Sequence, residues 1–285
     1  MARLMLGFPN RIDDASLSGG SWEATLPLTN LQNRTLGKVA RSTDDAEAST
    51  KFDIDQTTDP NNRAISLVNH NMSLAATVRI YGSTVSNFAT TVYDSGAIDV
   101  WPVVYLPDDL EWEDNNWWSG QYSEEEREGY TWTFVHVLPT NTNARYWRVT
   151  ISDTTNAAGY VQIGRAFLGP VWQPEINMAY GVDIGWSTDT QVQKARSGAQ
   201  YFDERTPQRN VNFAVNNMTL SQAMGRAFEL QRRAGTSKEI LYIFDPDDTV
   251  QALRRQFLGR LRQLSPIEFP TINIHNVGFN IEELL

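Results

Sequence analysis

The sequence predicts a mainly β protein in which an N-terminal jelly-roll β-sandwich is followed by a tube-like β-sandwich domain carrying one main α-helix at about 220–234. Three observations predict this fold class. Apolar residues alternate over many short runs in the first 170 residues. No run of ten residues there has the period of a helix. A stretch rich in Gly and Pro at 169–174 separates this part from one that mixes strands with a helix.

Period-two patterning predicts the strands of the first part. Phe52 and Ile54 share one face of the run 51–55, with polar residues between them. Four more runs alternate in the same way, at 76–81, 131–137, 146–151 and 160–167. Turn-forming residues separate the runs at 59–62, 69–71, 93–96 and 141–143. Short strands joined by turns, with no helix between them, are typical of a sandwich or jelly roll.

The second part contains the clearest helix of the chain. Thr219 and Gln222 form a capping-box pattern at its start, and Gly235 suits the position after its end. The apolar residues between them recur at helical spacing: Leu220, Ala223, Met224, Ala227, Phe228 and Leu230. We therefore expect an amphipathic helix that buries this stripe.

Strands are predicted around that helix at 209–215, 239–244, 257–261 and 271–283, with a short helical turn at 248–254. In the last of these runs Val277, Phe279 and Ile281 share a face. The chain then divides into an N-terminal arm at 1–20, a jelly roll at 21–170, a linker or extended arm at 171–208, and a ring-forming β-sandwich with the helix at 209–285.

Composition excludes several classes of function. The chain of 285 residues has 24 Lys+Arg against 34 Asp+Glu and a net charge of −10, which argues against nucleic-acid binding because phosphates need a basic face. The absence of Cys excludes disulfide scaffolds and thiolate metal sites. No apolar run is long enough for a membrane span or a signal peptide. We expect a soluble protein made in the cytoplasm.

Catalytic motifs are absent from the sequence. It has no phosphate-binding loop, no nucleophile elbow and no zinc-protease motif. The three histidines, His70, His136 and His275, each lie in a turn or strand pattern that needs no catalytic role. We expect no enzyme activity and no cofactor. An alternative is a glycan-cleaving enzyme that uses Glu111 with a carboxylate among 124–126.

The most unusual stretch runs from Asp108 to Trp132. Its first part, 108–128, holds nine acidic residues and one Arg. Five aromatic residues are our candidates for an interface or a carbohydrate-binding site: Trp112, Trp117, Trp118, Tyr122 and Tyr130. Aromatic rings anchor protein interfaces and stack on the C–H faces of sugars, while acids bind hydroxyl groups. A long loop with a local aromatic core, or a Ca²⁺ site, is an alternative; the acids that could hold the ion are Asp108, Asp109, Glu111, Glu113 and Asp114.

The N-terminal part resembles a known fold family. Ser21–Leu31, Val39–Ser42 and Phe52–Asp55 are similar to the opening of discoidin-like, galactose-binding-fold modules. Tyr146–Ile151 and Tyr160–Pro170 are similar to the last strands of that fold. Asn69–Ser73 with Tyr93–Gly96 resembles modules in tail proteins of tailed bacteriophages. This resemblance covers roughly 20–170 and implies a galactose-binding-like jelly roll.

The C-terminal part resembles the tube-derived β-sandwich of phage tail-tip (distal tail) proteins. The residues that carry this resemblance are Ser197–Asp203, Arg209–Phe213, the amphipathic helix and Phe279–Leu284. It implies a homo-oligomeric ring that continues the tail tube and anchors hub or receptor-binding proteins. The chain departs from the family because its jelly roll precedes the sandwich.

Two functional hypotheses follow. The leading one is a structural protein of the virion, in a phage tail tip or baseplate, with tail tube and hub proteins as partners and an outward jelly roll. The alternative is a carbohydrate-binding module protein that contacts host-surface glycans. The first places the protein in the virion tail tip after synthesis in the host cytoplasm.

Overall fold

The computed structural model describes residues 3–285, without the side chain of Pro107. The chain forms two compact units. Unit 1 comprises the chain up to Trp172 together with Leu241–Phe257, and unit 2 comprises Gln173–Ile240 with Leu258–Leu285. These units do not follow the predicted boundaries, because one short C-terminal stretch belongs with the N-terminal unit.

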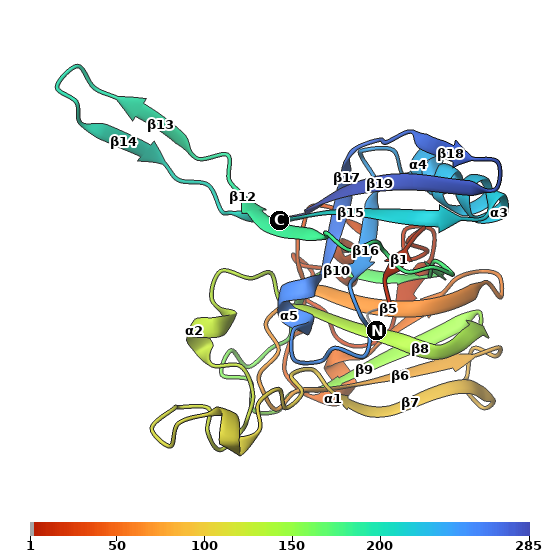
Figure 1. The fold of residues 1–285 in the computed structure, drawn as a ribbon. Coiled ribbons are helices and arrows are strands. Elements are labelled where there is room, and N and C mark those ends of the chain that lie inside the picture. The colour runs from red at the N-terminus through yellow and green to blue at the C-terminus, as the bar shows by residue number, and fades with distance from the viewer. Residues whose placement is uncertain (1–2) are drawn as a thin grey trace. The chain divides into compact units, whose positions relative to one another are not determined.

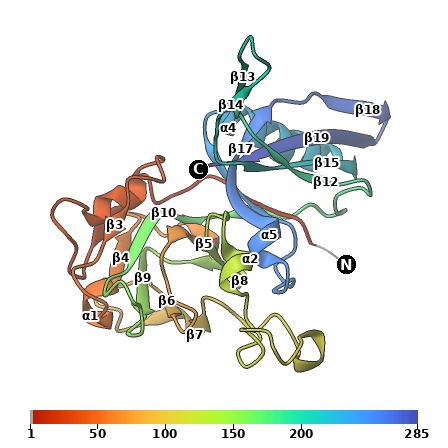
Figure 2. The same cartoon turned by 90° about the vertical axis from the view of Figure 1, so that its left-hand side faces the viewer.

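Unit 1 contains two antiparallel sheets, as the sequence predicts for a β-sandwich. One sheet has the order β3 (Ala40–Arg41), β10 (Gln162–Gly169), β5 (Asn61–His70) and β8 (Thr133–Asn143). The other, whose strands lie side by side in Figure 2, has the order β2 (Ser16–Ser18), β4 (Phe52–Asp55), β9 (Tyr146–Ser152), β6 (Thr77–Ser83) and β7 (Thr91–Asp99). Its helical segments are short: η1 (Leu28–Gln32), α1 (Glu47–Thr50), η2 (Pro107–Asp109), α2 (Glu124–Arg127) and α5 (Ala252–Arg255).

Alternation along these strands builds the core of unit 1. In β9 the side chains of Trp147, Val149 and Ile151 are fully buried, and the polar residues between them are partly exposed. Buried residues of both sheets pack into one cluster, which includes Phe52, Ile54, Ile65, Leu67, Val78, Ile80, Phe134 and Ile163. The predicted period-two runs are therefore confirmed as the inward faces of a sandwich.

The N-terminal residues are strands of unit 1, so the predicted arm at 1–20 is corrected. In β1 (Met5–Gly7) Leu6 pairs with Trp172 of β11 (Val171–Trp172) on one side and with Tyr242 of β16 (Glu239–Ile243) on the other. The residues of β1 are buried, as is Leu4. Burial of this apolar run favours a paired strand over a free arm.

Two predicted turns lie inside strands. The turn at 93–96 is a bulge in β7, where the register with β6 shifts between Arg79 and Tyr81. Gly96 has a positive φ of 66°, and its N–H donates to the Asp94 carboxylate at 3.0 Å. The turn at 141–143 belongs to β8, whose Asn143 pairs with Asn61. Turn-forming residues mark bulges and strand ends as well as reversals.

Unit 2 contains one main sheet. Its described strands have the order β17 (Gln256–Gln263), β19 (Ile274–Glu283), β15 (Gln208–Met218) and β12 (Asp183–Ser187), and β18 (Ile267–Thr271) also pairs with β19. The sequence predicts a β-sandwich with one main helix here, and the helical stretch Ala223–Phe228 contacts β19. The predicted linker at 171–208 contains β11, β12 and a separate hairpin of β13 (Gln191–Lys194) and β14 (Gln200–Asp203), which projects from the other strands of unit 2 (Figure 1).

The predicted helix at 220–234 is confirmed as one continuous helical segment: α3 (Leu220–Gln222), a π-helical stretch η3 (Ala223–Phe228) and α4 (Glu229–Ala234). Thr219 caps it, since its side chain accepts from the N–H of Gln222. Only part of the predicted apolar stripe is buried, because Leu220, Met224 and Phe228 are exposed. Met224 and Phe228 lie within the π-helical stretch, whose larger number of residues per turn departs from the helical spacing on which the predicted stripe was based. No helix among residues 3–285 is long and apolar enough to cross a membrane.

Candidate functional site

The acidic segment, 108–128, folds as a loop that is anchored at its base. Gln121 donates from its amide to the carbonyls of Leu74 at 3.0 Å and Trp101 at 2.6 Å. Gly120 has a φ of +60°, and a Cβ there would lie 2.6 Å from the carbonyl oxygen of Tyr105. This residue therefore has to be Gly. The anchoring gives the loop a defined conformation although most of its side chains are exposed.

Three indole rings gather at the tip of this segment. The ring centroids of Trp112 and Trp117 are 4.7 Å apart, as are those of Trp117 and Trp118. Each pair meets edge to face, an arrangement that the quadrupole of aromatic rings favours. Trp112 is 70% exposed and Trp118 is 81% exposed, whereas Trp117 is half-buried between them. We call these three residues the indole cluster.

The two tyrosines among the candidates lie elsewhere. Tyr122 is buried, with 3% of its surface exposed, and its hydroxyl donates to the carbonyl of Val250. Burial raises the pKa of Tyr122 to about 12, against a weaker opposing effect of the Arg254 charge. Tyr130 is half-buried against the core of unit 1. Tyr122 is therefore enclosed and Tyr130 is partly covered, and their role as interface or carbohydrate-binding candidates stays a prediction.

The acids of the segment have two kinds of surroundings. Asp109 and Asp114 accept from backbone N–H groups three residues before them, at 3.1 and 2.8 Å. Glu111, Glu113 and Asp108 are exposed. Within residues 3–285 no three acidic or histidine side chains come together in a group that could hold a metal ion. The carboxylates of Glu111, Glu113 and Asp108 are open to solvent, whereas Asp109 and Asp114 are each held by a backbone N–H.

Glu126 belongs to a fixed network at the other end of the segment. Its carboxylate accepts from the hydroxyl of Tyr105 and from the N–H of Ser123 at 3.0 Å, and it pairs with Arg254 at 3.2 Å. Burial acts to raise the pKa of Glu126, but these hydrogen bonds and the Arg254 charge outweigh it and lower the pKa. A glycosidase needs an acid whose pKa is raised. Glu126 is unsuited to that role.

The three histidines each have a structural environment. His70 is buried, and burial lowers its pKa to about 3. His136 lies 2.6 Å from the hydroxyl of Tyr93, and burial lowers its pKa as well. His275 is buried beside the carbonyl of Met218, with its Nδ1 3.1 Å from that oxygen. Because burial lowers the pKa of His70 and of His136, these two side chains are poorly suited to take up protons from a substrate.

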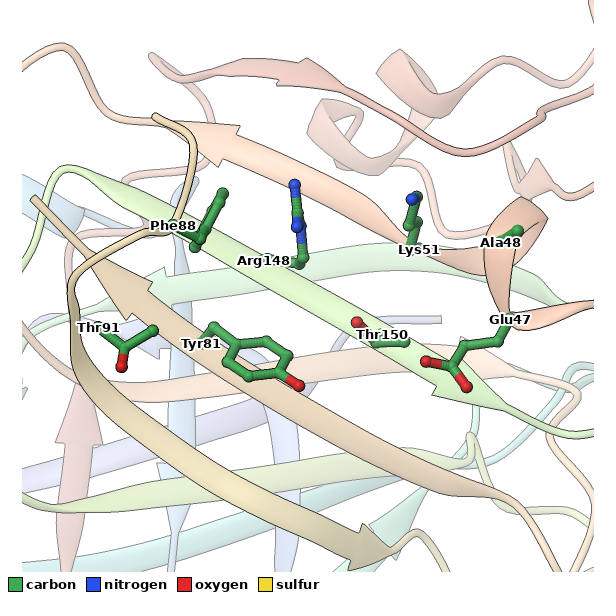
Figure 3. A pocket seen from close by; sticks show the side chains of 8 residues that line it. All are labelled: Glu47, Ala48, Lys51, Tyr81, Phe88, Thr91, Arg148 and Thr150. Atoms are coloured by element: carbon green, nitrogen blue, oxygen red, sulfur yellow. The ribbon is translucent and has the colours of Figure 1, made fainter. Parts of the chain in front are cut away.

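A shallow hollow of about 460 Å³ lies on the outer face of the five-stranded sheet (Figure 3). It is lined by α1, by β6 and β9, and by the loop that enters β7. The Arg148 guanidinium is held by Asp53 at 2.7 and 2.8 Å and lies 4.2 Å from the ring centre of Phe88. Phe88 has a positive φ of 56°. Because Arg148 is already paired with Asp53, the polar groups that the hollow offers are the Lys51 ammonium, the Glu47 carboxylate and the threonine hydroxyls, beside the Tyr81 ring.

Sequence reasoning missed the residues of this hollow. Tyr81, Arg148 and Thr150 are the outward positions of strands whose inward positions the alternation predicts. The alternation alone indicates that they face away from the core. The alternation does not indicate that Phe88, which lies in a loop, also lines the hollow.

No family model matches the chain, and no curated protein matches it. The chain is similar to solved carbohydrate-binding structures. CBM32-1 from a family 31 glycoside hydrolase of Clostridium perfringens is 11% identical with a TM-score of 0.36, covering 57% of this chain and 98% of that chain. The lectin domain of lectinolysin complexed with Lewis B antigen is 12% identical with a TM-score of 0.38, covering 57% and 98%.

The family 32 CBM from C. perfringens NanJ in complex with galactose is 8% identical with a TM-score of 0.37, covering 59% of this chain and 99% of that chain. A family 89 glycoside hydrolase from Clostridium perfringens is 10% identical with a TM-score of 0.38, and this chain spans 15% of its length. Likenesses at these identities and TM-scores do not indicate what this chain binds.

Proposed function

We propose that unit 1 binds neutral glycans through the indole cluster. The observation that carries this proposal is the exposure of two indoles, Trp112 and Trp118, on an anchored loop. Large apolar rings in water are costly to leave uncovered, and an isolated exposed aromatic cluster marks a binding surface. Because the rings meet edge to face, their free faces point in different directions and can border a ring-shaped ligand.

The surrounding charges favour a neutral sugar over an acidic one. Three acidic residues flank Trp112 in the sequence: Glu111, Glu113 and Asp114. Their carboxylates can accept hydrogen bonds from hydroxyl groups. The one cation of the segment, Arg127, lies over the rings of Trp101 and Trp132, at 5.3 and 5.0 Å from their centres. No cation of the segment is therefore available to neutralise a carboxylate or sulfate on the ligand.

The test is a glycan array followed by calorimetry with the full chain. Trp118→Ala should weaken binding about tenfold, since one stacking ring contributes about 1–2 kcal/mol. Trp186→Ala, which removes an indole that is 50% exposed in unit 2, is the matched control and should leave affinity unchanged. Blank arrays with the intact chain, or equal losses in both variants, would exclude the indole cluster as a glycan site. Capture of a protein ligand that requires Trp118 would reassign the cluster to a protein partner.

A second candidate function is assembly into the virion tail tip, which one observation in unit 2 favours. Among the described residues, fourteen of the twenty-one large hydrophobic side chains that are exposed lie in this unit. Exposed apolar surface of that extent is typical of a protein that becomes covered on assembly. Under this candidate the chain forms an oligomer in contact with tail tube and hub proteins after synthesis in the host cytoplasm.

The assembly candidate has its own experiment. Particles purified from a producing host should contain the chain at a fixed ratio to tail proteins, measured by quantitative mass spectrometry. The purified chain should also form oligomers by light scattering. A chain that is monomeric at all concentrations and absent from particles would contradict this candidate while leaving the glycan proposal intact.

A further inference from the structure

The hairpin of β13 and β14, with its flanking residues, forms an arm at 188–207. Val192 pairs directly with Phe202, and Gln193 pairs with Tyr201. Hydrogen bonds fix the base of the arm, where the Arg205 N–H donates to the Thr190 hydroxyl at 3.0 Å. All residues of both strands are exposed. The arm extends away from the main sheet of unit 2 (Figure 1).

An exposed two-stranded ribbon is an incomplete structure. Such hairpins are marginally stable in water, because two strands have no third neighbour and no layer to pack against. In this arm Val192 is 51% exposed and Phe202 is 57% exposed. The outer edge of β13 has no strand beside it in the described chain. Unpaired strand edges are templates for another strand.

The charges of the arm are arranged with opposite signs at its two ends. The tip carries the cations Lys194 and Arg196. The base carries Asp189, Asp203 and Glu204, of which Asp203 pairs with Arg205 at 2.9 Å. No ion pair is found for the tip cations within residues 3–285. The tip therefore has an excess of positive charge and the base an excess of negative charge.

We propose that the arms of two copies of this chain pair antiparallel about a two-fold axis, β13 against β13. This arrangement places the positive tip of each arm beside the negative base of the other, so the arm is complementary to itself. Val192 then lies opposite Val192 of the second copy. The four-stranded ribbon has one continuous apolar row of Phe202, Val192 and their two equivalents. Unit 2 has equal numbers of acidic and basic residues, so this unit itself adds no net repulsion between two copies.

The pairing goes beyond glycan binding and does not depend on it, because the indole cluster and the arm belong to different units. It deepens the assembly candidate by naming a contact and its symmetry. A two-fold contact closes on itself as a dimer, whereas a ring needs a head-to-tail contact. The oligomeric state and the position of the cross-link therefore distinguish a two-fold dimer from a ring.

A single introduced cysteine tests the geometry, since the chain has no Cys of its own. Val192→Cys in the full chain should form a disulfide-linked dimer under a mild thiol oxidant, because opposed residues of antiparallel strands have Cβ atoms about 5 Å apart. Val92→Cys is the matched control, as this valine is 52% exposed on β7 of unit 1. It should give about tenfold less dimer at the same concentration, since only random collision links it.

Charge reversal tests the complementarity. The double variant Lys194→Glu with Arg196→Glu should weaken self-association at least about tenfold, measured by light scattering over a concentration series. Asp203→Lys with Glu204→Lys should do the same. Mixing the two variants should restore a dimer that contains one copy of each, because opposite charges face each other again.

Three outcomes would overturn the proposal. The first is an intact chain that is monomeric by light scattering up to about 100 μM, well above the range of a stable dimer. The second is equal cross-linking of Val192→Cys and Val92→Cys. The third is that no dimer forms when the two charge-reversed variants are mixed. Particles larger than a dimer that survive removal of 190–204 would assign assembly to another surface of unit 2. None of these results bears on the glycan proposal, so the two proposals are tested separately.

Discussion

Unit 1 and unit 2 differ in how much of their apolar surface is exposed to solvent. Unit 1 buries its apolar strand faces in one closed core between two sheets and exposes an aromatic cluster at one loop. Unit 2 holds about a third of the chain but most of the exposed large hydrophobic side chains. A closed core gives stability without partners. An exposed apolar surface leaves part of the hydrophobic stabilisation unused in the isolated chain.

Charge divides in the same way. The net charge of −10 lies in unit 1, since acidic and basic residues are equal in number in unit 2. Like-charged surfaces repel one another, whereas a neutral surface can approach its own copy. The acidic composition of the whole chain is therefore a property of unit 1, and the proposed association of the chain concerns the neutral unit 2.

The largest expected effect is on the closed core of unit 1. Trp147→Ala removes a fully buried indole and should reduce the free energy of unfolding by about 3–5 kcal/mol, since the cavity cannot collapse completely. Denaturant titration followed by fluorescence measures this loss. Trp112→Ala, at an exposed indole of the same unit, should change stability by less than about 0.5 kcal/mol. Equal losses of stability in Trp147→Ala and Trp112→Ala would mean that the core of unit 1 is not closed.

The second effect concerns a buried ion pair in unit 2. Arg209 donates from its backbone N–H and guanidinium to Glu283, at 3.1 and 2.8 Å to one carboxylate oxygen. Glu283→Ala removes the carboxylate to which the buried guanidinium donates and should cost about 3 kcal/mol. Denaturant titration checks this, with the exposed Glu204→Ala as control. A negligible loss would mean that this ion pair contributes little to the stability of unit 2.

The third effect is a pH dependence of unit 1. Burial raises the pKa of Tyr122 to about 12, whereas it is near 10.0 in an unfolded chain. The unfolded state then ionises first, so the stabilisation is complete below about pH 10 and is lost as pH rises toward about 12. Unfolding midpoints in urea should fall across this window.

Tyr122→Phe should flatten this fall without abolishing it, because burial also raises the pKa of Tyr242 in the same unit. An unchanged slope in this variant would place the alkaline sensitivity outside the base of the acidic segment.

The smallest effect concerns the helix of unit 2. Thr219→Ala removes the side chain that caps the N–H of Gln222, and should cost about 0.5–1 kcal/mol. Ser221→Ala, at an exposed position of the same helix, should be neutral. Thermal unfolding followed by circular dichroism distinguishes the two. A neutral Thr219→Ala would mean that packing on β19, rather than the cap, determines where this helix begins.

Much of the fold could be predicted from particular residues. The alternation of Phe52 with Ile54, and of Val277 with Phe279 and Ile281, identifies inward faces because side chains of a strand point to opposite sides in turn. The helix bounds followed from Thr219 and Gly235. The bulge at Gly96 could not be predicted, since the same residues form turns and bulges and only the partner strand distinguishes them.

The candidate site was predicted in part. The sequence placed five rings in one segment, but two of them, Tyr122 and Tyr130, pack inward. The acceptor of the Tyr122 hydroxyl is a carbonyl 128 residues away, at Val250. No pattern within the segment indicates such a partner.

Sequence patterns were sufficient to predict several of the strands, such as those at 52–55, 146–151 and 277–281, the place of the main helix, and where the acidic and aromatic residues concentrate. These are local properties, set by the periodicity of the backbone and by composition. Only the tertiary structure decided that Trp112 and Trp118 are exposed while Tyr122 is covered, and that β13 and β14 form an arm without neighbours. Exposure depends on which distant segments cover a side chain, and that is fixed only when the whole chain has packed.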